Sequence, residues 1–387
     1  MKERTLSPGS IRGIKTLSVV ESAEALAPRV AELAELGERE RHLPDELVAS
    51  FRMAGLLTMG APASLGGGQV AVDEMLRAVE AIARADAAAA WCAMIQSTSG
   101  VTGAYLAPEG AAEVFARGDA ILGGVYAPMG RAVRVDGGFR ASGRWAFASG
   151  SRHCTWLVGG CLLEGMPPRG LLFRAAEVTI HDTWRVSGLA GTGSNDFEVA
   201  DVFVPLARTT DLASERPLLD GALYKFPVFG LLALGIAAVA LGTARGAIDD
   251  ILELAGSKTP TGSRRKLAER PLVQFQVAQS EAILGSARAF VFDTVARCWT
   301  AADRGEELTL DHRARLRLAA THATTASAQV VDAMYNAGGG TSIYSTSPLQ
   351  RRFRDIHAAT QHVMVGPPTY ELAGRILLGL ESDTSVL

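Results

Sequence analysis

Apolar residues recur with a helical period in the first third of the chain. Across Val72–Ala88 they stand three and four positions apart, which places them on one face of a helix. Asp73 and Glu74 fall in its first turn, where carboxylates interact favourably with the helix dipole. A second helix, nearly free of charge and rich in small residues, is expected over 87–105. The first 118 residues are therefore predicted to be mainly helical.

The pattern changes near Gly118. Short β-type runs follow, separated by Gly or Pro clusters, and they lie at 120–126, 132–135, 139–147, 155–163, 171–173, 178–180 and 197–204. Asp136-Gly137 falls between two of these runs and predicts a hairpin turn, because glycine reaches positive φ at little cost. So many short strands in succession indicate a small barrel or a sandwich.

After Pro205 the chain becomes helical again. Long helices are predicted at 228–255, 268–302, 310–337 and 350–364, with a last one at 369–380. Helices of this length with short links favour a four-helix bundle. The expected fold is α+β in three parts: an N-terminal helical domain over 1–118, a central small β-barrel over 119–212 and a C-terminal four-helix bundle over 213–387.

Charge and composition exclude several classes of protein. The chain has 387 residues and a net charge of −3, which argues against a broad nucleic-acid-binding surface. Residues 1–15 carry charge and no apolar signal core, so we expect a cytoplasmic protein. The uncharged run 226–244 is rich in small residues and suits a helix buried in a bundle better than a membrane span. The four cysteines form no CxxC pair and lie at no zinc-ligand spacing, so we expect no metal site.

Three motifs then resemble one superfamily. They are GGFRASGRWAFASG (137–150), GLAGTGSNDFEVADVFVP (188–205) and LQRRFRDIHAATQHVMV (349–365). In order, they resemble the β-domain motif that meets the flavin ring, the motif that closes this domain, and the C-terminal helix over the flavin in proteins of the acyl-CoA dehydrogenase fold. The resemblance covers nearly the whole chain. It is strongest to the flavin-dependent monooxygenase branch, which includes the oxygenase components of two-component aromatic hydroxylases.

Two chemistries occur on this fold, and the catalytic base separates them. In many dehydrogenases a Glu follows the Arg-Asp pair of the C-terminal helix by about eight residues; here the eighth residue after Asp355 is Val363. Other members carry the base on the first bundle helix, but 222–248 contains no Glu or Asp. Glu371 remains, but a place in a first turn capped by Thr369 accounts for it better. An acyl-CoA dehydrogenase or flavin oxidase with Glu371 as a displaced base is the alternative hypothesis.

The monooxygenase resemblance implies reduced flavin, FMN or FAD, as the cofactor. Its C4a-hydroperoxide, formed with O2, would hydroxylate a small aromatic or heteroaromatic substrate. His362 matches a His that faces the reactive flavin edge in this branch and can donate a hydrogen bond or shuttle a proton. Seven residues separate Asp355 from His362, which predicts a shared helix face. Ser149 matches a hydroxyl that bonds flavin N5 or the C4a oxygen. A buried structural His and an ordinary turn Ser are the competing interpretations.

Other residues are candidate flavin contacts by the same resemblance. Trp145 is expected near the isoalloxazine or, equally, in the core of the β domain. A run of backbone N–H groups and hydroxyls is offered by Gly191, Thr192, Gly193 and Ser194. Gly339 and Gly340 resemble a segment that contacts the dinucleotide end of FAD across a subunit interface, where glycine permits close approach. Arg264 could pair with phosphate, although a solvated loop explains it too.

The second N-terminal helix carries the candidate substrate contacts. Several relatives have a His or Tyr there, whereas this chain offers Gln96 and Ser97, with Tyr126 as a further candidate. No GxGxxG turn is visible, so a separate NAD(P)H flavin reductase is expected to supply the reduced flavin. The resemblance also implies a homotetramer. A third hypothesis is a bundle protein that serves binding or assembly without catalysis.

Overall fold

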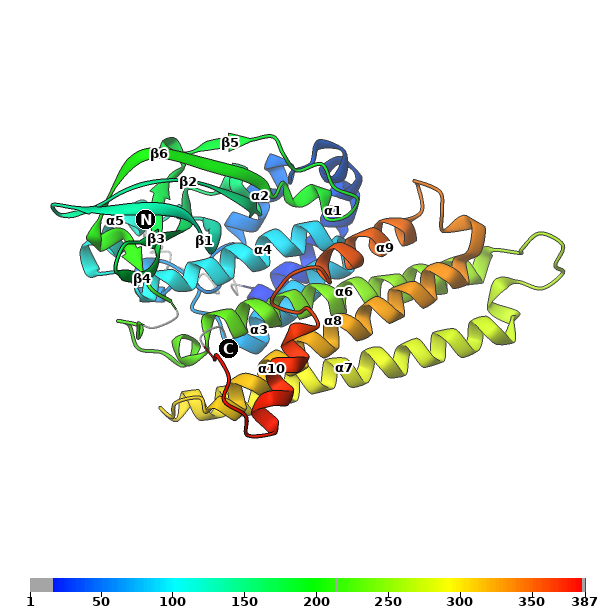
Figure 1. Ribbon diagram of the computed structural model, residues 1–387. Helices are drawn as coiled ribbons and strands as arrows, with labels where there is room; N and C mark the ends of the chain where they lie inside the picture. Colours follow the sequence, from blue (N-terminus) through cyan, green and yellow to red (C-terminus); the bar gives the residue numbers. More distant parts are fainter. Residues whose placement is uncertain (1–16, 213–214, 385–386) are drawn as a thin grey trace, which may run out of the picture.

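The computed structural model describes residues 17–212, 215–384 and 387, so the charged N-terminal stretch lies outside the described residues. Helices open the described chain and surround one side of the β domain (Figure 1). Their bounds are Val19–Glu40 (α1), Asp45–Met53 (α2), Val72–Ala85 (α3), Ala87–Gly100 (α4) and Pro108–Phe115 (α5). The helical interpretation of this part of the sequence is confirmed.

Helices α3 and α4 differ in how much of their surface is buried, as their sequences predict. Apolar residues of α3 lie on one buried face, whereas every residue of α4 except Ile95 is buried. Asp86 separates the two helices and caps α4, since its Oδ1 accepts the backbone N–H of Ala89 at 2.7 Å. Helix α4 runs between the sheet and the C-terminal helices (Figure 1), so side chains on it can reach both.

The central strands form one sheet, in the order β5-β6-β2-β1-β3-β4-β7. Their bounds are Leu122–Val135 (β1), Gly138–Ala148 (β2), Trp156–Leu163 (β3), Met166–Arg174 (β4), Thr179–His181 (β5), Asn195–Pro205 (β6) and Thr209–Thr210 (β7). The β1–β3 pair is parallel and the other pairs are antiparallel. Among the described strands no pairing joins β5 to β7, and together they form the seven-stranded sheet of the predicted central β domain.

Two details of the sheet test the sequence pattern. The predicted hairpin is confirmed, since Val135 pairs with Gly138 across a turn in which Gly137 has φ +77°. The two runs predicted at 120–126 and 132–135 are instead one strand, β1. Its pairing with β3 shifts register on both sides of Pro128, and these irregularities produced the apparent break in the pattern.

The C-terminal part is helical, as predicted, and three long helices lie side by side in Figure 1. The bounds are Val228–Ser257 (α6), Pro271–Asp303 (α7), Leu310–Gly338 (α8), Pro348–Ala359 (α9) and Pro368–Leu377 (α10). The helix expected at 350–364 therefore ends at Ala359, well before the Pro367-Pro368 pair. Helix α10 begins after Pro367 without a side-chain cap, so the predicted capping role of Thr369 is wrong.

Helix α6 is the most apolar helix and lies inside the protein. It is the one described helix that is long and apolar enough to cross a membrane, but 83% of its most apolar window is buried. Small residues allow its neighbours to approach closely: a Cβ on Gly235 would stand 2.3 Å from Met94 of α4. One continuous hydrophobic core includes residues of the N-terminal helices, the sheet and the bundle, and it holds the three parts in a fixed relation.

Candidate active site

Ser149 lies at the end of β2 inside a group of buried polar side chains. Its Oγ accepts the indole N–H of Trp91, from α4, at 3.0 Å and lies 2.8 Å from Ser194 Oγ. Ser194 Oγ is 2.7 Å from Thr192 Oγ1, which donates to the carbonyl of Leu189 at 2.8 Å. Three predicted residues, Ser149, Thr192 and Ser194, are thus brought together.

His362 lies in the turn after α9, not on the helix. The helix face that it was expected to share with Asp355 therefore does not exist, because α9 ends at Ala359. The imidazole instead packs against the Trp91 indole, with ring centroids 5.8 Å apart. Since Trp91 also donates to Ser149, the indole joins the two predicted catalytic residues. Sequence reasoning missed Trp91, because a helix buried on all sides gives no periodicity that marks one residue.

The hydrogen bonding of His362 fixes which nitrogen carries the proton. Its Nδ1 accepts the backbone N–H of Met364 at 3.2 Å, so the proton of the neutral ring sits on Nε2. Burial, and then the positive charge of Arg317, lower the pKa of His362 to about 4. The ring is therefore uncharged near neutral pH and presents one N–H donor.

Arg317 of α8 supports this turn from the bundle side. Arg317 is only 3% exposed, and its Nη2 donates to the carbonyl of Met364 at 3.0 Å. Met364 thus accepts from Arg317 through its carbonyl and donates to His362 through its N–H. Burial lowers the pKa of Arg317 to about 10, which leaves it charged at neutral pH.

Asp355 connects α9 to the start of the second motif, 188–205. Its Oδ1 accepts the backbone N–H of Leu189 at 2.6 Å, shortly before Thr192 and Ser194, whose hydroxyls contact one another beside Ser149. Burial, and next the nearby carboxylate of Asp86, raise the pKa of Asp355 to about 7. The side chain therefore positions backbone and does not serve as an exposed base.

Two aromatic residues of β2, Trp145 and Phe147, lie in different environments although strand alternation would place them on the same face. Trp145 is fully buried in the sheet core, where it stacks on Phe197 and its indole N–H donates to the carbonyl of Gly160 at 2.8 Å. No surface of Trp145 remains for a flavin, so the core interpretation holds. Phe147 is 70% exposed, has φ +70° and makes an edge contact with Trp184. It is the exposed aromatic residue beside Ser149 that sequence reasoning missed.

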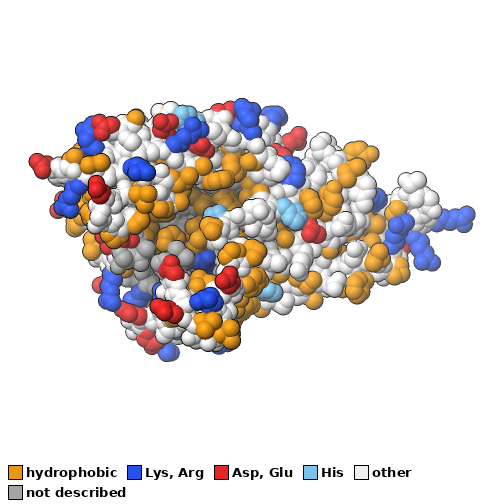
Figure 2. All heavy atoms as spheres, viewed as in Figure 1, with side chains coloured by type: hydrophobic (Ala, Val, Ile, Leu, Met, Phe, Trp, Pro, Cys, Tyr) orange, Lys and Arg blue, Asp and Glu red, His pale blue; other side chains and the backbone are white. Residues whose placement is uncertain are grey.

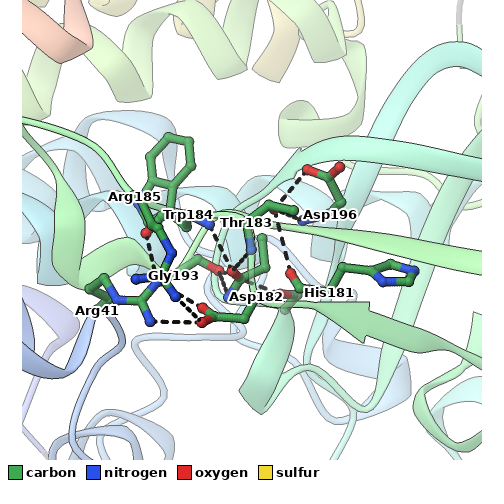
Figure 3. Close-up of polar contacts among 10 residues, drawn as sticks. Arg41, His181, Asp182, Thr183, Trp184, Arg185, Gly193 and Asp196 are labelled. Atoms are coloured by element: carbon green, nitrogen blue, oxygen red, sulfur yellow. Dashed lines mark hydrogen bonds and ion pairs between the residues drawn. The ribbon is translucent and has the colours of Figure 1, made fainter.

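An ion pair between Arg41 and Asp182 connects the end of α1 to the segment before β6, as Figure 3 shows. Arg41 donates to both carboxylate oxygens of Asp182, at 2.7 and 2.9 Å, and to the carbonyl of Trp184 at 3.1 Å. Gly193 has φ +53°, and a Cβ there would stand 2.9 Å from the Arg41 carbonyl. Gly191 packs similarly closely against α4 and α1. Both glycines serve the close packing of this loop.

The predicted substrate residues have different environments. Gln96 is buried, and its Oε1 and the Nε2 of His153 have no hydrogen-bond partner among the described residues. Gln96 Nε2 and His153 Nε2 lie close to Gly150, next to Ser149, and the two unpaired atoms are themselves buried. Buried polar atoms without a partner usually mark a place where a further polar group or water is expected. Ser97 Oγ is already bound to the carbonyl of Leu56 at 3.0 Å and has a structural contact. Tyr126 bonds Thr102, and burial raises its pKa to about 12.

The remaining candidate cofactor residues lie elsewhere. Arg264 belongs to the exposed α6–α7 loop, and Gly339 and Gly340 are exposed at the end of α8. These segments meet at the bundle end farthest from the sheet (Figure 1), where Lys258 donates to the Gly338 carbonyl at 2.7 Å. The basic tip formed there is visible in Figure 2. A single chain does not bring this tip to Ser149.

The alternative base, Glu371, is exposed in the first turn of α10. Its position favours interaction with the helix dipole. The face in Figure 2 has a hollow lined mainly by hydrophobic side chains between the sheet and the helices. Neutral hydroxyl and imidazole groups near an exposed aromatic side chain suit a flat aromatic ligand with a polar edge. The donor set and the exposed Phe147 ring thus fit a flavin.

Family models support this interpretation. Residues 19–115 match the model described as "Acyl-CoA dehydrogenase, N-terminal domain", and residues 234–367 match "Acyl-CoA dehydrogenase, C-terminal domain". An indole-3-acetate monooxygenase of Pseudomonas putida is 33% identical over 92% of this chain and 93% of its own length. The oxygenase subunit HsaA of Mycobacterium tuberculosis, a flavin-dependent monooxygenase, is 30% identical over 97% of this chain and its full length.

The chain belongs to the flavin-dependent monooxygenases of the acyl-CoA dehydrogenase fold. Solved structures agree: 3-HSA hydroxylase from Rhodococcus sp. RHA1 has a TM-score of 0.90 at 28% identity, covering 96% of this chain and 99% of that one. XiaF from Streptomyces sp., solved with FADH2 and glycerol, has a TM-score of 0.89 at 25% identity, covering 95% and 96%. The protein is a flavin-dependent oxidoreductase whose cofactor is reduced flavin, and the monooxygenase hypothesis is supported over the dehydrogenase alternative.

Proposed function

We propose that this protein is the oxygenase component of a two-component system that hydroxylates a small aromatic or heteroaromatic substrate, with Ser149 and His362 at the reacting edge of the flavin. The observation that carries the proposal is the contact of Trp91 with both residues. It brings a hydroxyl and a neutral imidazole N–H together with no carboxylate at the contact. This set suits oxygen transfer better than removal of a substrate proton by a base.

Each residue has a separate task. When bound, reduced flavin supplies the electrons that activate O2 for insertion of one oxygen atom into the substrate. His362 Nε2–H donates a hydrogen bond at the reacting edge and, being neutral near pH 7, can also relay a proton. Ser149 holds the flavin ring through its hydroxyl. The apolar lining excludes water, which limits the loss of oxidising equivalents as H2O2. Gln96, with its unpaired Oε1, orients the polar group of the substrate.

The proposal includes partners. A separate flavin reductase supplies the reduced flavin, as the name of the FADH2-dependent resorcinol hydroxylase oxygenase component of Rhizobium sp. implies for that relative. The exposed basic tip with Arg264, Gly339 and Gly340 lies at the far end of the bundle from Ser149. Flavin binding by the tip therefore calls for another subunit, which agrees with a homotetramer located in the cytoplasm.

The decisive experiment mixes anaerobic protein and chemically reduced FAD or FMN with oxygenated buffer. Indole-3-acetate and resorcinol serve as probe substrates, because the names of two relatives specify them or their hydroxylation. Product and H2O2 are measured per flavin oxidised. We expect His362→Ala to divert most of the flavin equivalents from product to H2O2, by tenfold or more in their ratio, since positioned acid–base groups contribute about 10²–10⁴-fold.

His357→Ala is the matched control. His357 lies on α9 five residues earlier, pairs with Asp332 at 2.8 Å and packs edge-on against Phe353. It should keep the wild-type ratio of product to H2O2. Equal coupling in wild type and His362→Ala would refute the role of His362. Bleaching of oxidised flavin by an acyl-CoA, without added reductant, would instead support the dehydrogenase alternative with Glu371.

A further inference from the structure

The buried hydroxyls beside Ser149 form a chain with a fixed direction. Four contacts link five groups in a row: Trp91, Ser149, Ser194, Thr192 and the Leu189 carbonyl, with separations of 3.0, 2.8, 2.7 and 2.8 Å. Four hydrogens are available, one on the indole nitrogen and one on each hydroxyl. Each contact therefore needs one of these hydrogens, and none is left over.

The carbonyl end sets the direction. A carbonyl oxygen can only accept, so the 2.8 Å contact with Leu189 uses the Thr192 hydrogen. Thr192 must then accept from Ser194, and Ser194 must accept from Ser149. At the other end the indole N–H of Trp91 can only donate, so it points at Ser149. The two ends demand the same direction, and reversal would cost the chain a hydrogen bond.

This direction decides what Ser149 can offer a ligand. Its one hydrogen is directed at Ser194, and one of its two lone pairs accepts from Trp91. A single lone pair remains, so Ser149 can accept one further hydrogen bond but cannot donate one. The chain is almost fully buried, and water cannot readily replace a lost partner.

We infer that the Trp91–Ser149–Ser194–Thr192 chain makes Ser149 a dedicated acceptor and so gives the site a preference for reduced over oxidised flavin. This inference rests on the proposed placement of the flavin edge beside Ser149. Reduced flavin carries an N5–H donor, which matches the free lone pair. Oxidised flavin presents N5 as an acceptor, which Ser149 can satisfy only if the chain loses a bond. Ser194 and Thr192 thus act as positioning residues, not as direct flavin ligands.

The preference suits a protein that receives its cofactor by diffusion. Reduced flavin binds, and after oxidation it meets a hydroxyl that no longer matches it, which favours release. One mismatched hydrogen bond of ordinary strength corresponds to about fivefold in the ratio of the two dissociation constants. The chain need only supply this differential term, because contacts common to both redox states cancel in the ratio.

Thr192→Val tests the inference, because it removes the acceptor for Ser194. Ser194 can then donate to Ser149, and Ser149 becomes free to donate to oxidised N5. We expect the ratio Kd(oxidised)/Kd(reduced) to fall about fivefold, equivalent to a drop of about 20 mV in the potential of the bound two-electron couple. Oxidised flavin is titrated by its fluorescence, reduced flavin by anaerobic ultrafiltration, and the potential by dye equilibration.

Three further variants complete the test. Ser194→Ala frees the Ser149 hydrogen directly, so it should lower the ratio similarly and covers the case in which Thr192→Val does not fold. Thr192→Ser keeps the hydroxyl and should keep the wild-type ratio. Thr243→Val removes a buried hydroxyl that donates within α6 to Val239 at 2.7 Å, and it should leave the ratio unchanged.

The outcomes separate this inference from the proposed function. An unchanged ratio in Thr192→Val or Ser194→Ala, with wild-type protein that binds reduced flavin and hydroxylates a probe, overturns the inference alone. A wild-type protein that binds neither redox state overturns the proposed function. A fall in the ratio for both hydroxyl deletions, with both control variants unchanged, supports the directed chain.

Discussion

Replacing Asp355 by Asn should stabilise the protein, by an amount that grows as the pH rises from about 4 to 7 and is constant above that. Asp355 is 5% exposed, and its Oδ1 accepts the Leu189 N–H at 2.6 Å. Asn retains this acceptor and the size of the side chain but cannot ionise. Burial first, and the Asp86 carboxylate second, raise the pKa of Asp355 from 3.8 to about 7. The ionised form is therefore the one that the folded protein disfavours.

The sign and size follow from proton linkage. Between pH 3.8 and about 7 the folded state holds a proton that the unfolded state releases, so this stabilisation is present below pH 3.8 and lost as pH rises through 7. A difference of about three units at 1.36 kcal/mol each gives an upper value of about 4 kcal/mol. Asp86 shares the repulsion, so we expect a gain for Asp355→Asn on the order of 2–4 kcal/mol above pH 7.

The assay compares urea midpoints of wild type and Asp355→Asn by circular dichroism at pH 5, 6.5 and 8. The difference should be about a third of its full value at pH 5, larger at pH 6.5 and complete at pH 8. Asp182→Asn is a control of opposite sign. Hydrogen bonds from Arg41 lower the pKa of Asp182 below 3.8, so the substitution should destabilise the protein equally at pH 5, 6.5 and 8. A gain for Asp355→Asn that does not change with pH, or a loss at pH 8, would refute the reasoning.

Two further predictions concern the turn after α9 and the loop before β6. Arg317→Met removes the positive charge that is the second cause, next to burial, of the low pKa of His362, so this pKa should rise from about 4. In a peroxide assay, the variant should then release more H2O2 per flavin oxidised between pH 5 and 6, while the wild-type value stays constant. Gly193→Ala places a side chain at φ +53° and 2.9 Å from the Arg41 carbonyl, which should cost about 1–2 kcal/mol or more in thermal unfolding. Gly55→Ala, at φ +71° with nothing within 4 Å, measures the backbone part alone.

The sequence was sufficient for the order of elements and the family. Helical periodicity in 72–88, the Asp136-Gly137 turn and three ordered motifs each report local or family-wide constraints, and local constraints can be read without coordinates. The end of α9 could not be read in this way. Thr360 to Val365 contain neither Gly nor Pro, and the chain leaves the helix at Ala359 although the prolines come only at 367 and 368. Tertiary contacts with Arg317 and Trp91 hold this turn, and no local pattern encodes them.

The different environments of Trp145 and Phe147 have a similar cause. Alternation in a strand places residues 145 and 147 on the same face, so it cannot decide between the two predictions for Trp145, a flavin contact or the core of the β domain. The β2–β6 pairing shifts register between Trp145 and Ala148, and Phe147 takes φ +70° within the shift. The irregularity turns Phe147 outward while Trp145 stays inside, and it also directs Ser149 toward Trp91. A positive φ at a bulky residue is unfavourable locally and persists where the surroundings enforce it. The register shift that orients Phe147 and Ser149 therefore cannot be predicted from the sequence pattern, because strands are recognised by alternation and the shift interrupts it.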